Sequence, residues 1–384
     1  MTSPAPRRTA RVRRARGVVV YWQHDRLVLE NFFERTRVAA PVTALRVLDL
    51  CSSPRAMPAI RRALPEFRAA AVNRLVRDLL RLRLLERVGG SRGAAQPAPA
   101  AMAAWEPWNP AAGFFHFSTR DAAFPKSPAD AARLWRKLGP ARPMPSPIKR
   151  YPGARRIALP DRAAPDAFAE VLTARRTWRE FAPAPVDLGR LATLLRLTWG
   201  VQHWATVPGQ GKVALKTSPS GGARHAGEVY VVARRVEGLA PGLYHYETGD
   251  DALAALPRRR APAIEILLPG QPWYHDAPVL LIMTAVFERA QWRYAFARAY
   301  RAVLIEAGHL CQTCCLVATS LGLAPFCSMA FPDSRVDAML GLDGVGESAL
   351  YIAGVGVPPP AGWRPWRPGT RSRSRSEEVP WPHE

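Results

Sequence analysis

The feature that most constrains the fold is an apolar run over residues 278–287, Pro-Val-Leu-Leu-Ile-Met-Thr-Ala-Val-Phe. A strand with apolar side chains on both of its faces must be covered on both of them. Strand-like segments at 228–233 and 242–247 precede this run, and a helical pattern over 300–321 and a final strand at 349–356 follow it. We therefore expect an α+β domain, a mixed sheet flanked by helices.

A smaller domain is predicted at residues 17–92. Residues 18–22 and 26–29 are rich in β-forming residues and are separated by a turn-like His24-Asp25, which favours a hairpin. Three helical patterns come next, at 41–50, 57–64 and 72–80. A hairpin with three helices resembles winged-helix modules, and it is also similar to small peptide-binding domains attached to enzymes that modify ribosomally made peptides.

Three roles compete for this winged-helix-like domain. A DNA-binding domain would present a basic helix to the major groove. A peptide-binding domain would accept an extended leader segment at the edge of its hairpin. The third role is purely structural. The formal charge of +23 comes almost wholly from arginine, which indicates a compositional bias more than a selected nucleic-acid surface. We therefore favour peptide capture over nucleic-acid binding.

Composition divides the rest of the chain. Residues 1–16 are rich in arginine without any acid and are expected to be a disordered tail. Residues 93–104 have the Ala/Pro content of a linker, and 105–164 are expected to form an extended lead-in to the main domain at 165–357. Residues 358–384 are expected to be a second disordered tail.

The chain is expected to be cytoplasmic and to have no membrane partner. No uninterrupted apolar run approaches the ~18 residues of a membrane span, and the basic N-terminus lacks the apolar region of a signal peptide. Cys311, Cys314 and Cys315 lie near His309 and invite a zinc hypothesis. Free cysteines often behave as small buried apolar residues, however, and a closed site needs four ligands. We therefore expect no metal.

Two short motifs suit an anionic ligand with a planar ring. Arg175-Arg176-Thr177-Trp178-Arg179 places three guanidinium groups and a hydroxyl within five residues, and guanidinium groups match phosphate oxygens. Ser218-Pro219-Ser220-Gly221-Gly222 is a turn of small residues, which lets backbone N–H groups approach a ligand closely. Each motif by itself is more often a solvated surface than a site.

Taken in order, however, these motifs join a series that is much more specific. Its further members are Pro241-Gly242-Leu243-Tyr244-His245-Tyr246, Thr284-Ala285-Val286-Phe287-Glu288-Arg289, Glu306-Ala307-Gly308-His309 and Leu321-Gly322-Leu323. Together they resemble the SagB/ThcOx-type branch of the FMN-dependent nitroreductase superfamily. That branch includes azoline dehydrogenases of ribosomal peptide biosynthesis, and the chain is most similar to its peptide maturation dehydrogenases.

The resemblance implies a cofactor and its ligands. Arg175, Arg176, Thr177 and Arg179 would hold the phosphate and ribityl chain of FMN. The ring would be lined by Pro219, Ser220, Gly221 and Gly222, and approached from its other side by Ser328 and Met329. Members of this fold are usually homodimers with FMN at the interface, and the helix at 300–321 would belong to the dimer core.

The catalytic pair departs from the family pattern. Azoline dehydrogenases carry a Lys-Tyr pair where this chain has Arg293-Tyr294. Oxidation of an azoline needs a base for the Cα proton, and a phenol with a reference pKa of about 10 can serve if a nearby cation favours its ionised form. Arginine supplies that charge but stays protonated, so it is no base. Tyr294 is therefore the predicted base, and Arg293 supports it.

Several functions remain open at this point. We rank FMN-dependent dehydrogenation of a ribosomally synthesised peptide first, by azoline-to-azole oxidation or a related desaturation, with maturation-complex proteins as further partners. An NAD(P)H-dependent flavin reductase or dehydroamino-acid reductase is the second candidate. The third is a peptide-binding scaffold without activity.

Overall fold

The computed structural model describes residues 10–88, 103–122 apart from 109, isolated positions between 124 and 159, 166–256 and 263–363. The chain forms two compact units. Unit 1 comprises the N-terminal residues up to Arg120 together with Tyr294–Tyr300, and unit 2 comprises Asp121–Arg293 and the residues from Arg301 onward. Most of the predicted linker 93–104, most of the lead-in beyond 122 and the tail from 364 lie outside the described residues.

Unit 1 contains the predicted hairpin and its three helices. Strands β2 (Val18–Gln23) and β3 (Arg26–Asn31) pair antiparallel, and β4 (Thr36–Ala39) adds a third strand that the sequence did not predict. Helices α1 (Val42–Leu50), α2 (Met57–Arg62) and α3 (Ala69–Arg81) follow. Helix α3 buries Val72, Val76 and Leu79, which repeat at the spacing of one helical face. The apolar residues that predicted this helix are therefore the ones that face the core of unit 1.

The N-terminal tail was predicted to be disordered over residues 1–16, and its described part corrects this. Residues Arg11–Arg14 form strand β1, which pairs antiparallel with β5 (Arg55–Ala56) and with β6 (Leu85–Val88). Val12 is buried in the core, and Arg13 forms a 2.5 Å ion pair with Glu86, its neighbour across the ladder. The strand was not predicted from the sequence because three of its four residues are arginines and only Val12 is apolar.

Aromatic side chains complete unit 1. The short helix η1 (Glu106–Trp108) and α5 (Ala111–Thr119) carry buried Trp108 and His116 against Tyr300, and the buried Trp105, which directly precedes η1, packs there as well. His116 Nδ1 lies 2.8 Å from the Tyr300 hydroxyl. These residues were predicted as part of an extended lead-in to the main domain. Residues up to Arg120 belong instead to unit 1, because their apolar rings pack there.

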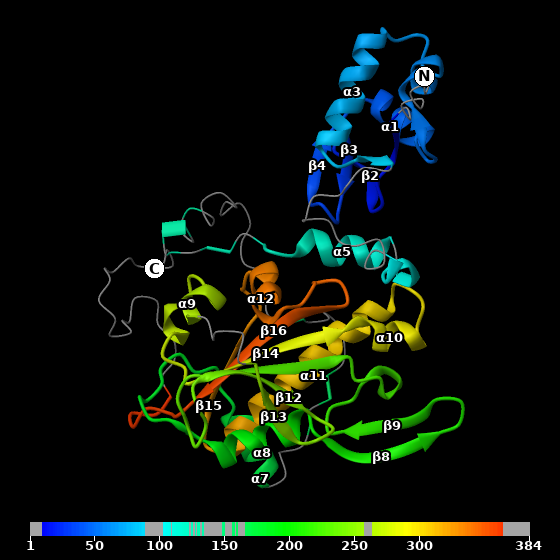
Figure 1. The fold of residues 1–384 in the computed structure, drawn as a ribbon. Coiled ribbons are helices and arrows are strands. Elements are labelled where there is room, and N and C mark those ends of the chain that lie inside the picture. Colours follow the sequence, from blue (N-terminus) through cyan, green and yellow to red (C-terminus); the bar gives the residue numbers. More distant parts are fainter. Residues whose placement is uncertain are drawn as a thin grey trace, which may run out of the picture. The chain divides into compact units, whose positions relative to one another are not determined.

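Unit 2 is built on a six-stranded sheet in the order β13-β12-β10-β14-β16-β15 (Figure 1). Its strands are β10 (Gly227–Ala233), β12 (Gly242–Glu247), β13 (Ala252–Ala255), β14 (Val279–Val286), β15 (Ala324–Ser328) and β16 (Glu347–Gly356). The α+β class is confirmed. Every pairing between the described strands of this sheet is antiparallel, and a parallel pair occurs between β7 (Val186–Asp187) and β11 (Val236–Glu237).

Helices cover both faces of β14, as its apolar run requires. Its residues Leu281 and Met283 pack in the cluster that holds α8 (Leu188–Thr198) and α11 (Ala299–Ser320). The alternate residues Leu280 and Ile282 pack in a second cluster with α9 (Ile264–Leu267), η3 (Pro272–Tyr274) and α12 (Asp333–Leu340). Figure 1 shows these helices on opposite sides of the sheet. Double coverage, and not parallel pairing, therefore explains the unbroken apolar strand.

Helix α11 corrects the expectation that no segment approaches the length of a membrane span. Among the described residues, this helix has the length and the apolar composition that would let it cross a membrane. Because Glu306 and His309 interrupt its apolar residues, the sequence of this helix contains no long uninterrupted apolar run. Its Leu310, Cys314 and Ala318 lie in the core beneath the sheet, where a core helix of a soluble-type fold has the same composition.

Candidate active site

The predicted phosphate-binding segment leaves the end of α7 (Ala167–Ala174), whose first turn is capped by Asp166. Arg175 ends the helix, and the chain continues to Glu180 without helix or strand. The Trp178 N–H donates to the Pro325 carbonyl at 2.9 Å, so the segment lies beside β15. The Thr177 carbonyl accepts a 3.2 Å hydrogen bond from the Trp363 indole. Backbone bonds thus hold the segment in place without using the predicted side chains.

The three guanidinium groups of this segment have different surroundings. Arg175 is half-buried, and its charge reaches Cys315 and Cys327. Hydrogen bonds from the neighbouring thiols lower the pKa of Cys327, whereas the Cys327 thiol and burial raise the pKa of Cys315, and Arg175 is a smaller influence at both. Arg176 is exposed; its Nη1 donates to the Thr173 and Arg175 carbonyls at 2.6 and 2.8 Å. A guanidinium has five N–H donors, so these bonds do not exhaust Arg176. Arg179 is half-buried and lies close enough to the buried Tyr274 for its charge to act on the phenol.

The Ser/Gly loop lies along α11. The Ser218 hydroxyl is 2.7 Å from that of Thr313, His309 Nδ1 lies 3.1 Å from the Pro219 carbonyl, and the Ser220 hydroxyl donates to Glu306 at 2.5 Å. The loop continues as the short helix η2 (Gly221–Ala223), inside which Gly222 has a φ of 62°. Glycine reaches this left-handed conformation without the clash that a Cβ causes, so the turn depends on it.

Glu306 organises the loop, although the sequence offered it only as one member of the motif series. Its second carboxylate oxygen accepts the Gly227 N–H at 3.0 Å, and the Ser220 hydroxyl accepts the His225 N–H at 2.9 Å. The Glu306 side chain is buried, so these bonds replace the water that its carboxylate lost. A Cβ on Gly227 would stand 2.5 Å from Leu310, which shows how closely β10 approaches α11.

A second polar cluster lies beside the loop, and the sequence did not predict it. Glu228 accepts bonds from Arg289 and from His245, the latter at 2.9 Å. Burial opposes ionisation of Glu228, but these two partners outweigh it and lower the pKa of its carboxyl. Lys216 ends β9 (Gly211–Lys216), which pairs with β8 (Val201–Val207) in an unpredicted hairpin. Burial lowers the pKa of the Lys216 amine, and Glu228 only partly opposes this effect.

His225 is the most strongly perturbed imidazole of this cluster. Its ring is buried and its Nε2 lies 2.9 Å from the Ala214 carbonyl. Burial, followed by the charge of Lys216, lowers its pKa to about 4 from an ordinary 6.5, and the charges of Arg224 and Arg289 act in the same direction. The imidazole is therefore neutral in the folded protein at neutral pH.

We expect His225 to make unit 2 sensitive to acid. Between pH 6.5 and about 4 the unfolded chain binds a proton that the folded chain does not, so stability falls as the pH is lowered through this window and levels off below it. Allowing for partial solvation, the loss is roughly 1–3 kcal/mol. Urea unfolding followed from pH 7 to 4 measures it.

His225→Asn is expected to flatten this dependence. Asparagine tolerates the positive φ of 44° at this position and has no charge to gain. His203→Asn, on the exposed face of β8, is the matched control and should keep the wild-type slope. His245 acts in the other direction, because its hydrogen bond to Glu228 raises its pKa and its stabilising contribution is lost as the pH rises. An unchanged acid slope in His225→Asn would contradict the assignment.

The predicted catalytic pair lies where α10 (Phe287–Arg293) ends. Arg293 is exposed and is the last residue of the first segment of unit 2. Tyr294 is half-buried and begins the segment Tyr294–Tyr300 that belongs to unit 1. The Tyr294 carbonyl accepts a 2.9 Å hydrogen bond from the Trp108 indole, and its ring contacts that of Phe296. The aromatic cluster of unit 1 thus fixes the backbone of the predicted base.

The two residues predicted on the other side of the ring follow β15. The Ser328 hydroxyl is 2.6 Å from Gln271 Oε1 and accepts the Ala330 N–H at 3.1 Å. Met329 is 65% exposed, which is unusual for an apolar side chain of this size and leaves it available to a ligand or a second chain.

Helix α11 connects the two predicted halves of the cofactor site. The Ser/Gly loop contacts it at Glu306, and the charge of Arg175 acts on it at Cys315. Nine residues separate these positions, which is roughly 14 Å along a helix. The two motifs are 42 positions apart in the sequence, from Arg176 to Ser218, yet both lie near the same helix.

Comparison with known proteins identifies the family. A family model described as "Nitroreductase family" matches residues 172–357. A protein of Methanocaldococcus jannaschii named as a nitroreductase is 32% identical over 201 residues, which are 52% of this chain and 95% of the relative. The chain belongs to the nitroreductase family. The expected superfamily is thereby confirmed, and the nitroreductase-family protein described here is an oxidoreductase of that type.

A second relative points to a branch of the family. The trifolitoxin-processing protein TfxB of Rhizobium leguminosarum bv. trifolii is 32% identical over 186 residues, which are 44% of this chain and 48% of the relative. The chain thus spans about half the length of TfxB. The expectation of a SagB-type peptide-maturation branch agrees with this match.

The solved structures that match this chain have low sequence identity to it. A protein of Anabaena variabilis named as a nitroreductase is 26% identical, with a TM-score of 0.42 over 50% of this chain and 38% of that one. The Escherichia coli microcin synthetase McbBCD complex, with truncated pro-microcin bound, is 21% identical over 63% of this chain and 90% of that one, with a TM-score of 0.44. Both scores are below 0.5, so family membership rests on the sequence relatives.

Proposed function

We propose that this nitroreductase-family protein binds FMN and dehydrogenates a ribosomally synthesised peptide during its maturation. The observation that carries the cofactor assignment is the placement of both predicted binding motifs along α11, with Glu306 holding the Ser/Gly loop. The name of the TfxB relative, a toxin-processing protein, supports a peptide substrate. An azoline-to-azole oxidation or a related desaturation follows from the resemblance of the whole motif series.

The residues present fit FMN. Arg175, Arg176 and Arg179 would neutralise the phosphate, and the Thr177 hydroxyl would add a donor. The Pro219–Gly222 turn, with its left-handed Gly222, would bring the backbone against the ring. When bound, FMN supplies two-electron redox chemistry, which no side chain of this protein can replace. The chain contributes binding, orientation and proton transfer, for which Tyr294 is the proposed base and Arg293 its supporting cation.

We further propose a homodimer with the substrate and cofactor sites completed at its interface. The outer side of α11 supports this, because Leu304 and Ile305 are large apolar residues that stay 36% and 57% exposed. Apolar side chains exposed on one turn of a helix are typical of a protein contact. All five cysteines are free thiols, which fits the reducing cytoplasm proposed as the location of the protein.

Unit 1 is proposed to capture the leader segment of the peptide substrate. Its β2-β3-β4 sheet leaves β2 at an edge, and an extended peptide can add a strand to such an edge. Proteins of a maturation complex are proposed as further partners. The DNA-binding alternative predicts an affinity for duplex DNA that falls steeply with salt, which a titration at two salt concentrations distinguishes from peptide capture.

The cofactor proposal is tested on the full purified chain. We expect a yellow protein that releases FMN on denaturation, at about one FMN per chain. A colourless protein that also fails to bind added FMN would remove the proposal. Oxidation of an azoline-containing peptide would then support dehydrogenation. FMN reduction by NAD(P)H with no peptide oxidation would favour the reductase, and peptide binding without turnover would favour the scaffold.

A further inference from the structure

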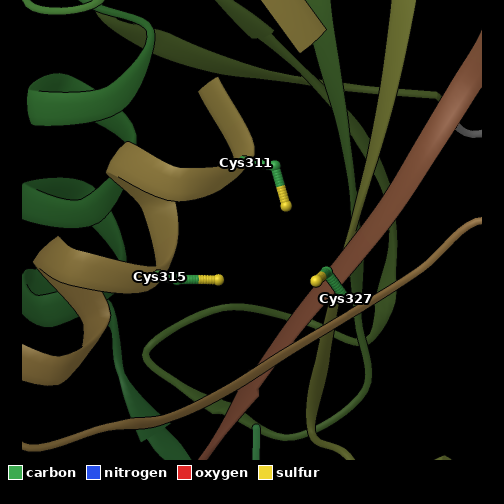
Figure 2. Close-up of side chains that lie close together, drawn as sticks. All are labelled: Cys311, Cys315 and Cys327. Carbon is green, nitrogen blue, oxygen red and sulfur yellow. The ribbon is translucent and has the colours of Figure 1, made fainter. Parts of the chain in front are cut away.

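Three cysteines meet at one point in the core of unit 2. Cys311 and Cys315 lie one turn apart on α11, and Cys327 lies on β15, which packs against that helix (Figure 2). Their sulfur atoms all lie within 4.8 Å of one another. Figure 2 shows the three side chains converging on one space between helix and strand. We call this group the thiol triad.

The triad differs from the cysteine group suggested by the sequence. Cys314 is next to Cys315 in the chain, but it is fully buried and does not belong to the triad. His309 is bonded to the Pro219 carbonyl, away from the three sulfurs. Cys327, which is 12 residues beyond Cys315, takes their place. We expected no metal because the helix cysteines could simply fill the core. That expectation did not consider Cys327, whose thiol lies at the same point as those of Cys311 and Cys315.

A hydroxyl donor and a cation lie beside the triad. The Tyr351 hydroxyl donates to Cys327 Sγ at 3.5 Å, and the half-buried Arg175 places a positive charge near Cys315 and Cys327. Cys311 and Cys315 are almost fully buried, whereas Cys327 and Tyr351 keep partial contact with solvent. The group therefore has an entry side, a hydroxyl donor and a countercharge, and a cluster that only fills a core needs none of these.

We propose that the thiol triad binds a single thiophilic metal ion, Zn²⁺ or Cu⁺. Sulfur ligands select these ions over Mg²⁺ and Ca²⁺, which take oxygen ligands. Binding exchanges three thiol protons for the ion and needs no oxidant or reductant. A Zn²⁺ ion with three thiolates carries a net charge of −1, which one arginine offsets, whereas Cu⁺ is satisfied by three ligands but leaves a charge of −2.

The geometry needs little adjustment. Three sulfurs bound at about 2.3 Å to one ion stand roughly 3.8 Å apart, so the widest pair would close by about 1 Å. Rotation about χ1 of Cys327 or Cys315 provides this movement without a shift of the backbone. A fourth zinc position would be taken by water or by the Tyr351 hydroxyl, which already contacts one of the ligands. The ion would tie β15 to α11 directly beside Arg175.

Metal content of the full chain tests the proposal. Purified protein, kept reduced, is expected to hold close to one equivalent of Zn²⁺ or Cu⁺ by elemental analysis, or to take it up from solution after chelation. Co²⁺ added to the chelated protein should give the intense near-ultraviolet absorption of cobalt–thiolate bonds. The bound ion should also protect three of the five cysteines from alkylation, as mass spectrometry can show.

Single variants locate the ligands. Cys311→Ser, Cys315→Ser and Cys327→Ser are each expected to weaken Zn²⁺ or Cu⁺ binding at least 100-fold. Cys314→Ala, on the same helix and equally buried, is the matched control and should bind as the wild type does, as should Cys51→Ala in unit 1. Circular dichroism and thermal unfolding confirm that each variant is folded. FMN content is measured in parallel, because loss of the flavin site would leave metal binding by the triad intact.

Two results would overturn the proposal. One is a folded, reduced wild-type protein that binds neither Zn²⁺, Cu⁺ nor Co²⁺ at micromolar concentration. The other is binding that survives in all three serine variants, which would place the ion elsewhere. A disulfide between Cys327 and either helix cysteine in protein purified without reductant, together with no metal binding after reduction, would assign the cluster to thiol oxidation.

Discussion

Replacement of Tyr294 by phenylalanine is expected to reduce peptide oxidation by about 10²- to 10⁴-fold while FMN stays bound. The variant loses only the phenol oxygen, which is the proposed acceptor of the substrate proton. The ring contact with Phe296 and the hydrogen bond from Trp108 to the Tyr294 carbonyl do not involve that oxygen and should persist. Turnover of a defined azoline peptide and the flavin spectrum measure the two effects separately.

Two further variants make the test specific. Tyr244→Phe removes a hydroxyl that bonds the Ala240 carbonyl at 2.8 Å in the sheet, and it should retain turnover. Lys216→Met removes the half-buried amine beside Glu228. Burial lowers the pKa of this amine, so it is the alternative candidate for the base. If Tyr294→Phe keeps wild-type turnover and Lys216→Met loses it, the base is Lys216 and the assignment of Tyr294 is wrong. An Arg293→Lys variant should remain active, because lysine restores the family pattern.

The double variant Arg175→Ala with Arg179→Ala is expected to purify without FMN. Each guanidinium contributes charge-assisted bonds worth about 1.5–3 kcal/mol, so loss of both weakens binding by roughly 10²- to 10⁴-fold. Titration with FMN, followed by quenching of flavin fluorescence, measures the change. Arg176 remains in the variant, where it is bonded to the Thr173 and Arg175 carbonyls.

The control must remove the same charge elsewhere in unit 2. Arg190→Ala with Arg335→Ala deletes two exposed arginines, one on α8 and one on α12, and should leave FMN affinity within about twofold. Equal weakening in both double variants would show that FMN responds to the overall positive charge and not to the predicted segment. Retention of FMN by Arg175→Ala with Arg179→Ala would place the phosphate elsewhere.

Much of the fold could be predicted because its signals are local. The apolar run at β14, the periodicity of α3 and the Asp187 cap of α8 each reflect an interaction within a few residues. Strand β1 and the hairpin β8–β9 were not predicted. The first has a single buried apolar residue, Val12, and the second is mostly exposed, so neither has the apolar alternation that marks a strand.

The candidate site divides in the same way. The arginine segment and the Ser/Gly loop were recognised as motifs, since the residue types that suit an anion and a close backbone approach are adjacent in the chain. The residues that hold them were not. Glu306 lies 86 positions from Ser220, and Glu228 lies 61 positions from Arg289, so no window of sequence contains either pair.

The sequence by itself therefore determined the α+β class and the order of its main elements, and it supplied the two motifs proposed to bind a ligand. Only the tertiary structure decided which distant groups lie together: the Ser/Gly loop on Glu306, Trp178 beside β15, and Cys327 with Cys311 and Cys315 in place of Cys314. The physical reason is that hydrogen bonds and ligand sets depend on distances of a few ångströms. Local propensity does not specify those distances, and they arise only when helix α11 packs against the sheet.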